Sequence, residues 1–91
     1  MRIFAKDISA DTQAVVGECY FLGAELYHTT DTHLDVFNEP SNAKTAANLI
    51  CKLATTDETQ QCKLMLPKPG IKCDGLYVDY TAGDGTIYYA L

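Results

Sequence analysis

The chain has 91 residues, of which 47% are hydrophobic and 21% are charged, and its net charge is −5. This length fits one domain with a thin core, and the composition is too apolar for an intrinsically disordered protein. The acidic balance disfavours nucleic acid and anionic membranes as partners, because both bind to a clustered basic face. No apolar run reaches the roughly 18–20 residues of a membrane-spanning helix, and Lys6 and Asp7 interrupt any signal-peptide core. We therefore expect residues 1–91 to form a single domain that is made in the cytoplasm.

Apolar and polar residues alternate along most of the chain, which is the two-residue period of a β-strand. In the N-terminal half this pattern predicts strands over residues 1–5, 11–16, 18–28 and 33–37. Short polar or glycine-containing turns separate them. The run over 18–28 is the longest β-favouring segment in the sequence.

The stretch over residues 41–53 allows two interpretations. A serine that can cap a helix and several alanines favour a helix there. However, Leu49, Cys51 and Leu53 alternate with their neighbours as in a strand. We interpret the stretch as a loop or a single helical turn, followed by a strand over 47–54.

The C-terminal half shows the same alternation between turn signals. It predicts strands over 62–66, 71–73, 76–80 and 86–91. Two prolines end the first of these strands, and Asp74-Gly75 predicts a tight hairpin turn inside the 71–80 stretch. About eight short strands with frequent turns are typical of a single-domain antiparallel β-sandwich or a jelly-roll-like barrel.

The four cysteines do not match a zinc motif, because no two of them are close enough in sequence to form a C-x2-C knuckle. A cytoplasmic protein keeps its thiols reduced, which disfavours disulfides. We interpret the cysteines as small apolar residues of the core, with a disulfide or a metal site as alternatives. They are Cys19, Cys51, Cys62 and Cys73.

The densest group of chemically active side chains is His28-x2-Asp31-x-His33-x-Asp35. These imidazoles and carboxylates would suit a divalent metal ion if they converged. Alternatively, His33 and Asp35 occupy the solvent face of a strand and Asp31 stabilises a turn. The spacing matches no specific metal motif, so we assign no metal-binding residue.

Nothing in the sequence indicates an enzyme. No serine or cysteine lies beside a base in a recognisable catalytic pattern. Gly83-Asp84-Gly85 leads into a predicted strand, whereas a phosphate-binding loop leads into a helix. We predict no catalytic residue, no cofactor-binding residue and no cofactor.

The tyrosines suggest a contact surface. Tyr77 and Tyr80 lie on opposite faces of one predicted strand, and Tyr88 and Tyr89 on opposite faces of the next. At least one member of each pair should point outward or toward an interface, where tyrosine is favoured. Packing at the rim of a thin core is the alternative, and exposed rings could also stack on a sugar.

Several segments share their pattern with one class of proteins. The most specific is Gly-Ile-Lys-Cys-Asp-Gly-Leu-Tyr-Val-Asp at 70–79, and the others are 2–6, 35–38, 49–53, 64–67 and 86–89. Together they resemble small β proteins encoded among the virion structural genes of tailed bacteriophages. The cysteine content is high for such a protein.

The resemblance implies a non-enzymatic virion protein and carries over no functional residue. Several proteins of this class are capsid decoration (cement) proteins that bind the outer shell as trimers. We therefore expect a homotrimer on the capsid surface with the major capsid protein as its partner. A head-tail or tail-associated component is a close variant, and a carbohydrate- or receptor-binding module is the alternative.

Overall fold

The computed structural model describes residues 2–91, and these form an all-β fold. All strand pairs among them are antiparallel. The prediction of a single-domain, antiparallel all-β fold is confirmed. No helix within the described residues is long and apolar enough to cross a membrane. The elements are β1 (Ile3–Ile8), β2 (Thr12–Tyr27), β3 (Thr32–Phe37), the 3-10 helix η1 (Ala46–Asn48), β4 (Leu49–Thr55), β5 (Gln61–Met65), β6 (Ile71–Tyr80) and β7 (Asp84–Ala90).

One sheet holds the strands in the order β1-β7-β2-β6-β3-β4, with β5 paired to β2. On one side, β2 pairs with β7 over residues 20–27. On its other side, β2 pairs first with β6 over residues 12–21 and then with β5 over residues 23–27. Therefore β5 and β6 lie end to end along one edge of β2, and residues 66–70 join them.

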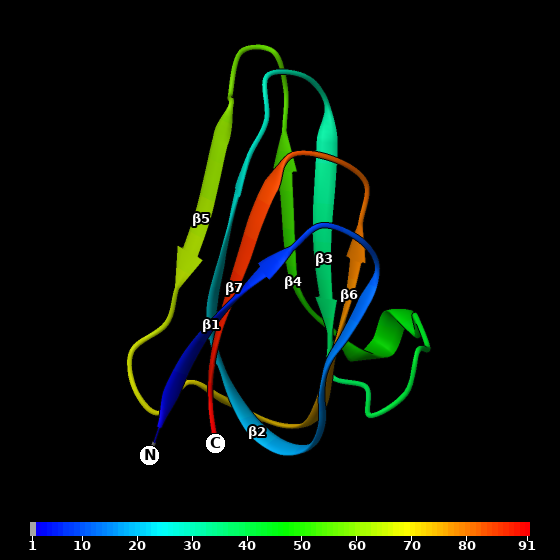
Figure 1. The fold of residues 1–91 in the computed structure, drawn as a ribbon, viewed down its shortest axis with the longest axis vertical. Helices are drawn as coiled ribbons and strands as arrows, with labels where there is room; N and C mark the ends of the chain where they lie inside the picture. Colours follow the sequence, from blue (N-terminus) through cyan, green and yellow to red (C-terminus); the bar gives the residue numbers. More distant parts are fainter. Residues whose placement is uncertain (1) are drawn as a thin grey trace.

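The sheet folds over itself because β2 is long and bends, as the lower part of Figure 1 shows. This bend brings β4, at one end of the strand order, close to β2 and β5. The inward side chains of the two layers meet in a single apolar core. The largest fully buried apolar side chains are Phe21, Leu26, Leu34, Val36, Leu76, Val78 and Ile87.

The predicted break between strands 11–16 and 18–28 is wrong, because β2 runs through it. Gly17 has φ +109, a backbone conformation that glycine adopts without strain. The register against β6 shifts between Val16 and Cys19, as in a β-bulge. The glycine thus bends a continuous strand, which sequence alternation alone does not distinguish from a turn.

The predicted hairpin at Asp74-Gly75 is also wrong, because both residues lie inside β6. A Cβ on Gly75 would lie 2.5 Å from Cα of Pro40 and 2.7 Å from the carbonyl oxygen of Glu39. The glycine therefore permits a close approach of the β3–β4 connection. Each of these two corrections joins two predicted strand ranges into one, and the sheet has seven strands.

The ambiguous stretch over 41–53 is resolved as a loop, the single 3-10 turn η1 and then β4. Our interpretation is confirmed in this order of elements. The strand begins at Leu49, two residues later than predicted.

Candidate functional site

The outward side chains of β1, β7, β2 and β5 form rows across the strands, because paired residues in an antiparallel sheet share a face. Their neighbours in sequence, such as Ala24 and Ile87, are fully buried in the core. Most side chains in two adjacent rows are apolar, and we call this surface the open face. The rows comprise Ala5, Tyr88, Gly23 and Met65 in one, and Ile3, Ala90 and Tyr20 in the other.

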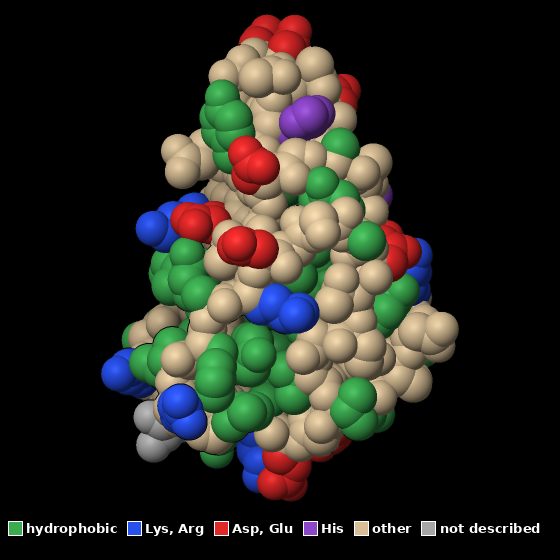
Figure 2. Space-filling view, viewed as in Figure 1, with side chains coloured by type: hydrophobic (Ala, Val, Ile, Leu, Met, Phe, Trp, Pro, Cys, Tyr) green, Lys and Arg blue, Asp and Glu red, His purple; other side chains and the backbone are tan. Residues whose placement is uncertain are grey.

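The large non-aromatic side chains of the open face are exposed, and Tyr20 and Tyr88 are half-buried. Ile3 and Met65 are 46% and 49% exposed. The Met65 sulfur lies over Gly23. A Cβ atom on Gly23 would be only 2.7 Å from this sulfur. Figure 2 shows the apolar side chains gathered at the lower left of the molecule, with basic side chains beside them. This is an outward sheet face that the core does not use.

Polar residues form the margins of the open face. The row beyond Tyr88 contains Asp7, Glu25 and Lys63. The Tyr88 hydroxyl donates a 2.8 Å hydrogen bond to Glu25 Oε1, and this bond raises the pKa of Tyr88. Across the face, Lys72 is the partner of Tyr20. The open face therefore has charged residues of both signs at one margin and a lysine at the other.

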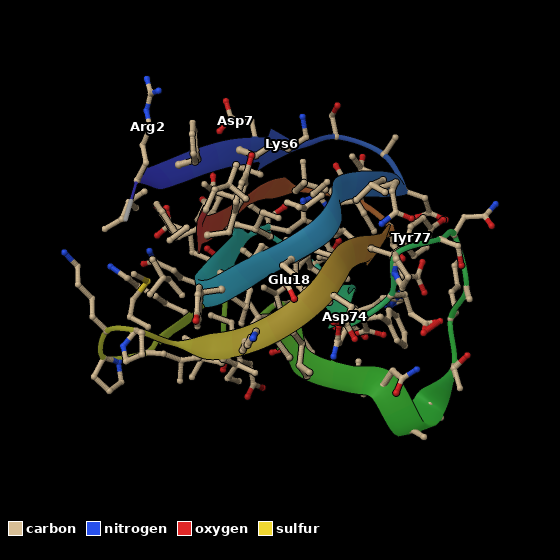
Figure 3. The ribbon with its side chains drawn as sticks, turned by 90° about the horizontal axis from the view of Figure 1, so that it is seen from below. Arg2, Lys6, Asp7, Glu18, Asp74 and Tyr77 are labelled. Carbon is tan, nitrogen blue, oxygen red and sulfur yellow. The ribbon has the colours of Figure 1, made fainter. Side chains whose placement is uncertain are left out.

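An unpaired strand edge adjoins the open face. Among residues 2–91, β1 pairs only with β7, so its other edge retains backbone donors and acceptors that no strand uses. The N–H of Arg2 donates to the carbonyl of Leu91 and the N–H of Leu91 donates to the carbonyl of Arg2, at 3.2 and 3.0 Å. In Figure 3, Arg2 and Asp7 point away from β1. A second chain could reach both this edge and the open face.

The tyrosines divide between packing and exposure. Tyr77 is buried, and the Tyr80 hydroxyl donates to the carbonyl of Gly83 at 2.7 Å, so this pair follows the packing alternative. Tyr88 is half-buried on the open face. It is thus the member of the Tyr88 and Tyr89 pair that points outward. Tyr89 stacks on Phe4 with ring centroids 5.4 Å apart.

A second group of side chains lies on the outward face of β3 and β6. Asp35 and Asp79 are directly paired across these strands, and His33 shares their face two residues before Asp35. His33 Nε2 is 3.9 Å from Asp79 Oδ2. One ligand atom from each residue lies within 4.8 Å of the other two. We call His33, Asp35 and Asp79 the β3–β6 cluster.

Only part of the negative charge around the β3–β6 cluster is neutralised. Lys44 Nζ contacts Asp79 Oδ1 at 3.2 Å and Asp11 Oδ2 at 3.0 Å. The pKa of Asp11 is lowered, mainly by the backbone N–H of Tyr80 and then by Lys44. In contrast, Asp35 Oδ1 is buried and accepts no hydrogen bond in the described structure. A buried carboxylate oxygen without a partner is unfavourable.

The structure brings together half of the group that the sequence singled out. His33 and Asp35 converge, whereas His28 and Asp31 are not part of the cluster. Their place is taken by Asp79, which the sequence analysis missed. The alternation of Asp79 with the core residue Val78 indicates an outward position. Nothing local in the sequence reveals that β6 pairs with β3.

The cysteines are free thiols, and all except the half-buried Cys62 are buried. Their interpretation as core residues is confirmed for Cys19, Cys51 and Cys73. Burial raises the pKa of Cys19 and of Cys51 to about 11. Because the thiolate is the reactive form, these two thiols are poor nucleophiles and poor metal ligands in the folded protein.

No family model, curated protein or solved structure matches this chain. Residues 2–91, as the structure describes them, contain no detected pocket. The open face and the β3–β6 cluster are thus the two candidate sites.

Proposed function

We propose that this protein is a non-enzymatic structural component of a tailed-phage virion. In this proposal it is a capsid decoration protein that forms a homotrimer and binds the major capsid lattice. The assignment to a virion rests on the sequence resemblance described above. The observation that supports self-association is the open face, which presents apolar rows beside an unpaired strand edge.

A second copy of the chain is the occupant that we assign to the open face. A small domain buries a modest share of its surface, so association adds stability that one chain cannot supply. Its margins carry charges of both signs, with Asp7, Glu25 and Lys63 on one side and Lys72 on the other. Polar residues around an apolar centre are the arrangement of a typical protein interface.

Attachment to a lattice fits the same surface chemistry. Many identical copies on a shell convert a modest contact into strong attachment, because the second and third subunits of a trimer bind at a high effective concentration. A sheet edge covered by neighbours no longer invites aggregation. Neither role requires a reacting molecule or a catalytic group.

Light scattering after size-exclusion chromatography tests self-association. We expect a trimer mass for the wild type and a monomer mass for the double variant Ile3→Glu, Met65→Glu, because two buried carboxylates would oppose the contact. The matched control is Val16→Glu, since Val16 is 75% exposed but lies outside the open face. This control should remain trimeric. A monomeric wild type at high concentration would contradict the proposal.

Co-sedimentation with purified shells of the phage that encodes the protein tests the proposed binding to the capsid lattice. We expect saturable binding by the wild type and much weaker binding by the monomeric double variant. Binding to tail or connector particles alone would favour the head-tail variant. A monomer that ignores shells and binds glycans would favour the carbohydrate-binding alternative.

A further inference from the structure

We propose that the β3–β6 cluster is a binding site for a divalent transition-metal ion such as Zn²⁺, with His33, Asp35 and Asp79 as its ligands. The proposal is independent of the virion function and of the open face. It rests on the ligand types, on their spacing and on the unpartnered oxygen of Asp35.

The ligand types select the class of metal. One imidazole and two carboxylates suit Zn²⁺ and its first-row neighbours, whereas Mg²⁺ and Ca²⁺ prefer oxygen ligands alone. Three protein ligands leave at least one coordination position open for water. The Thr81 hydroxyl lies 3.1 Å from His33 Nε2, and a metal ion on this nitrogen would replace that contact.

The spacing is close to that of a bound site. Two ligand atoms that each lie about 2.1 Å from a metal ion are about 3.0–3.5 Å apart. His33 Nε2 and Asp79 Oδ2 are 3.9 Å apart, and the widest separation in the cluster is within 4.8 Å. The half-exposed His33 side chain can rotate to supply this movement, while its strand stays paired.

The charges around the cluster leave a place for a cation. Lys44 occupies Oδ1 of Asp79, so Oδ2, on the side of His33, remains available. Lys52 is the partner of Asp35 on β4 but forms no ion pair with it among the described residues. The buried Oδ1 of Asp35 has no hydrogen-bond donor. A metal ion would satisfy this carboxylate and reduce its repulsion from Asp79.

Calorimetric titration of the folded, reduced protein with Zn²⁺ tests the proposal, with Mg²⁺ as the comparison ion. We expect one Zn²⁺ per chain and no comparable binding of Mg²⁺. His33→Gln and Asp35→Asn should each weaken Zn²⁺ binding by about tenfold or more, since each removes a ligand. His28→Gln is the matched control, because it changes the other histidine of the chain and should leave the affinity unchanged.

Two further measurements keep the result interpretable. Circular dichroism melts without metal show whether each variant is folded, and Asp35→Asn is the safer variant because Asp35 Oδ1 makes no hydrogen bond. A Co²⁺ complex should absorb as a nitrogen and oxygen site, without a thiolate charge-transfer band. Absence of Zn²⁺ binding, unchanged affinity in both ligand variants, or a thiolate band from the cysteines would each overturn the proposal.

Discussion

Two regions of the sheet differ in what covers their outward faces. Over β6, the chain supplies its own cover, because Gly75 lies against Pro40 and Tyr77 is only 8% exposed. Over β1, β7, β2 and β5, Figure 2 shows apolar side chains at the surface, and Met65 is about half exposed. A single chain therefore forms a complete core, and it covers its own outward surface over β6 but not over β1, β7, β2 and β5.

The cover over β6 is held by hydrogen bonds rather than by apolar packing alone. The Glu39 carboxylate accepts bonds from Asn48 Nδ2 at 2.6 Å and from Thr45 Oγ1 at 3.4 Å. The Glu39 carbonyl accepts a bond from Gln13 Nε2 at 2.9 Å. Asn38 Oδ1 accepts a bond from the N–H of Asp74 at 2.8 Å. These bonds connect the β3–β4 connection to both β2 and β6.

Replacing Gly75 should have the largest effect on stability, because a side chain there would push the β3–β4 connection away from β6. In Gly75→Ala the new methyl group would meet the backbone of Pro40 and Glu39. We expect a loss of about 3 kcal/mol in the free energy of unfolding, since neither backbone can move away easily. Urea denaturation measures this loss.

The control for that experiment is Gly17→Ala, where a Cβ meets no atom within 4 Å but φ is +109. Backbone strain alone should cost about 1–2 kcal/mol. If the two variants were equally stable, steric contact with the cover would not be the main reason for glycine at position 75.

Removing the Glu39 carboxylate tests whether the cover depends on its polar anchor. In Glu39→Ala, Asn48 Nδ2 loses its acceptor in a part-buried site, and we expect a loss of about 2 kcal/mol. Glu39→Gln should lose less, because an amide oxygen still accepts. Hydrogen exchange should be faster across 38–48 in Glu39→Ala and unchanged in β1, and equal exchange in both regions would contradict a local anchor.

Alkaline pH should weaken the core that both regions share. The pKa values of Cys19 and Cys51 rise to about 11 on folding, from an ordinary value of 9.0, because burial disfavours the thiolate. The folded state therefore holds protons that the unfolded state releases, so stability is full below about pH 9 and falls as pH rises through 11. Urea titrations between these pH values measure the slope.

The double variant Cys19→Ala, Cys51→Ala should show a flatter pH dependence. Tyr88, whose pKa is raised by Glu25, adds a contribution of the same sign, and Tyr88→Phe removes it. An unchanged slope in the cysteine variant would mean that these thiols do not titrate with unfolding.

The smallest effect is expected at Lys44, which links Asp11 to the β3–β6 cluster on an exposed surface. Exposed ion pairs contribute little, so the urea midpoint of Lys44→Met should match that of the wild type at neutral pH. The lowered pKa of Asp11 gives stability that is present above its ordinary value of 3.8 and is lost as pH falls. Part of this acid sensitivity should persist in Lys44→Met, because the Tyr80 N–H still donates to Asp11.

The fold class could be predicted because alternation is a local property of the sequence. The errors fell on Gly17 and Gly75, since a glycine at a turn, at a bulge and at a close approach looks the same without its neighbours. Pairing between distant strands is equally invisible to local patterns. For this reason His33 and Asp35 could be nominated, while Asp79, which completes their cluster, could not.

The end-to-end arrangement of β5 and β6 makes the intervening residues 66–70 a tolerant position for engineering. Both flanking strands are held in register by β2, and Pro67, Lys68 and Pro69 are exposed. Lengthening a surface loop costs little free energy, because closure entropy grows slowly with length. A peptide epitope placed between Pro67 and Pro69 would replace the turn that the Gly70 N–H closes on the Pro67 carbonyl, and it would be displayed on the outside of the molecule. Leu66 would keep its backbone hydrogen bond to Leu22.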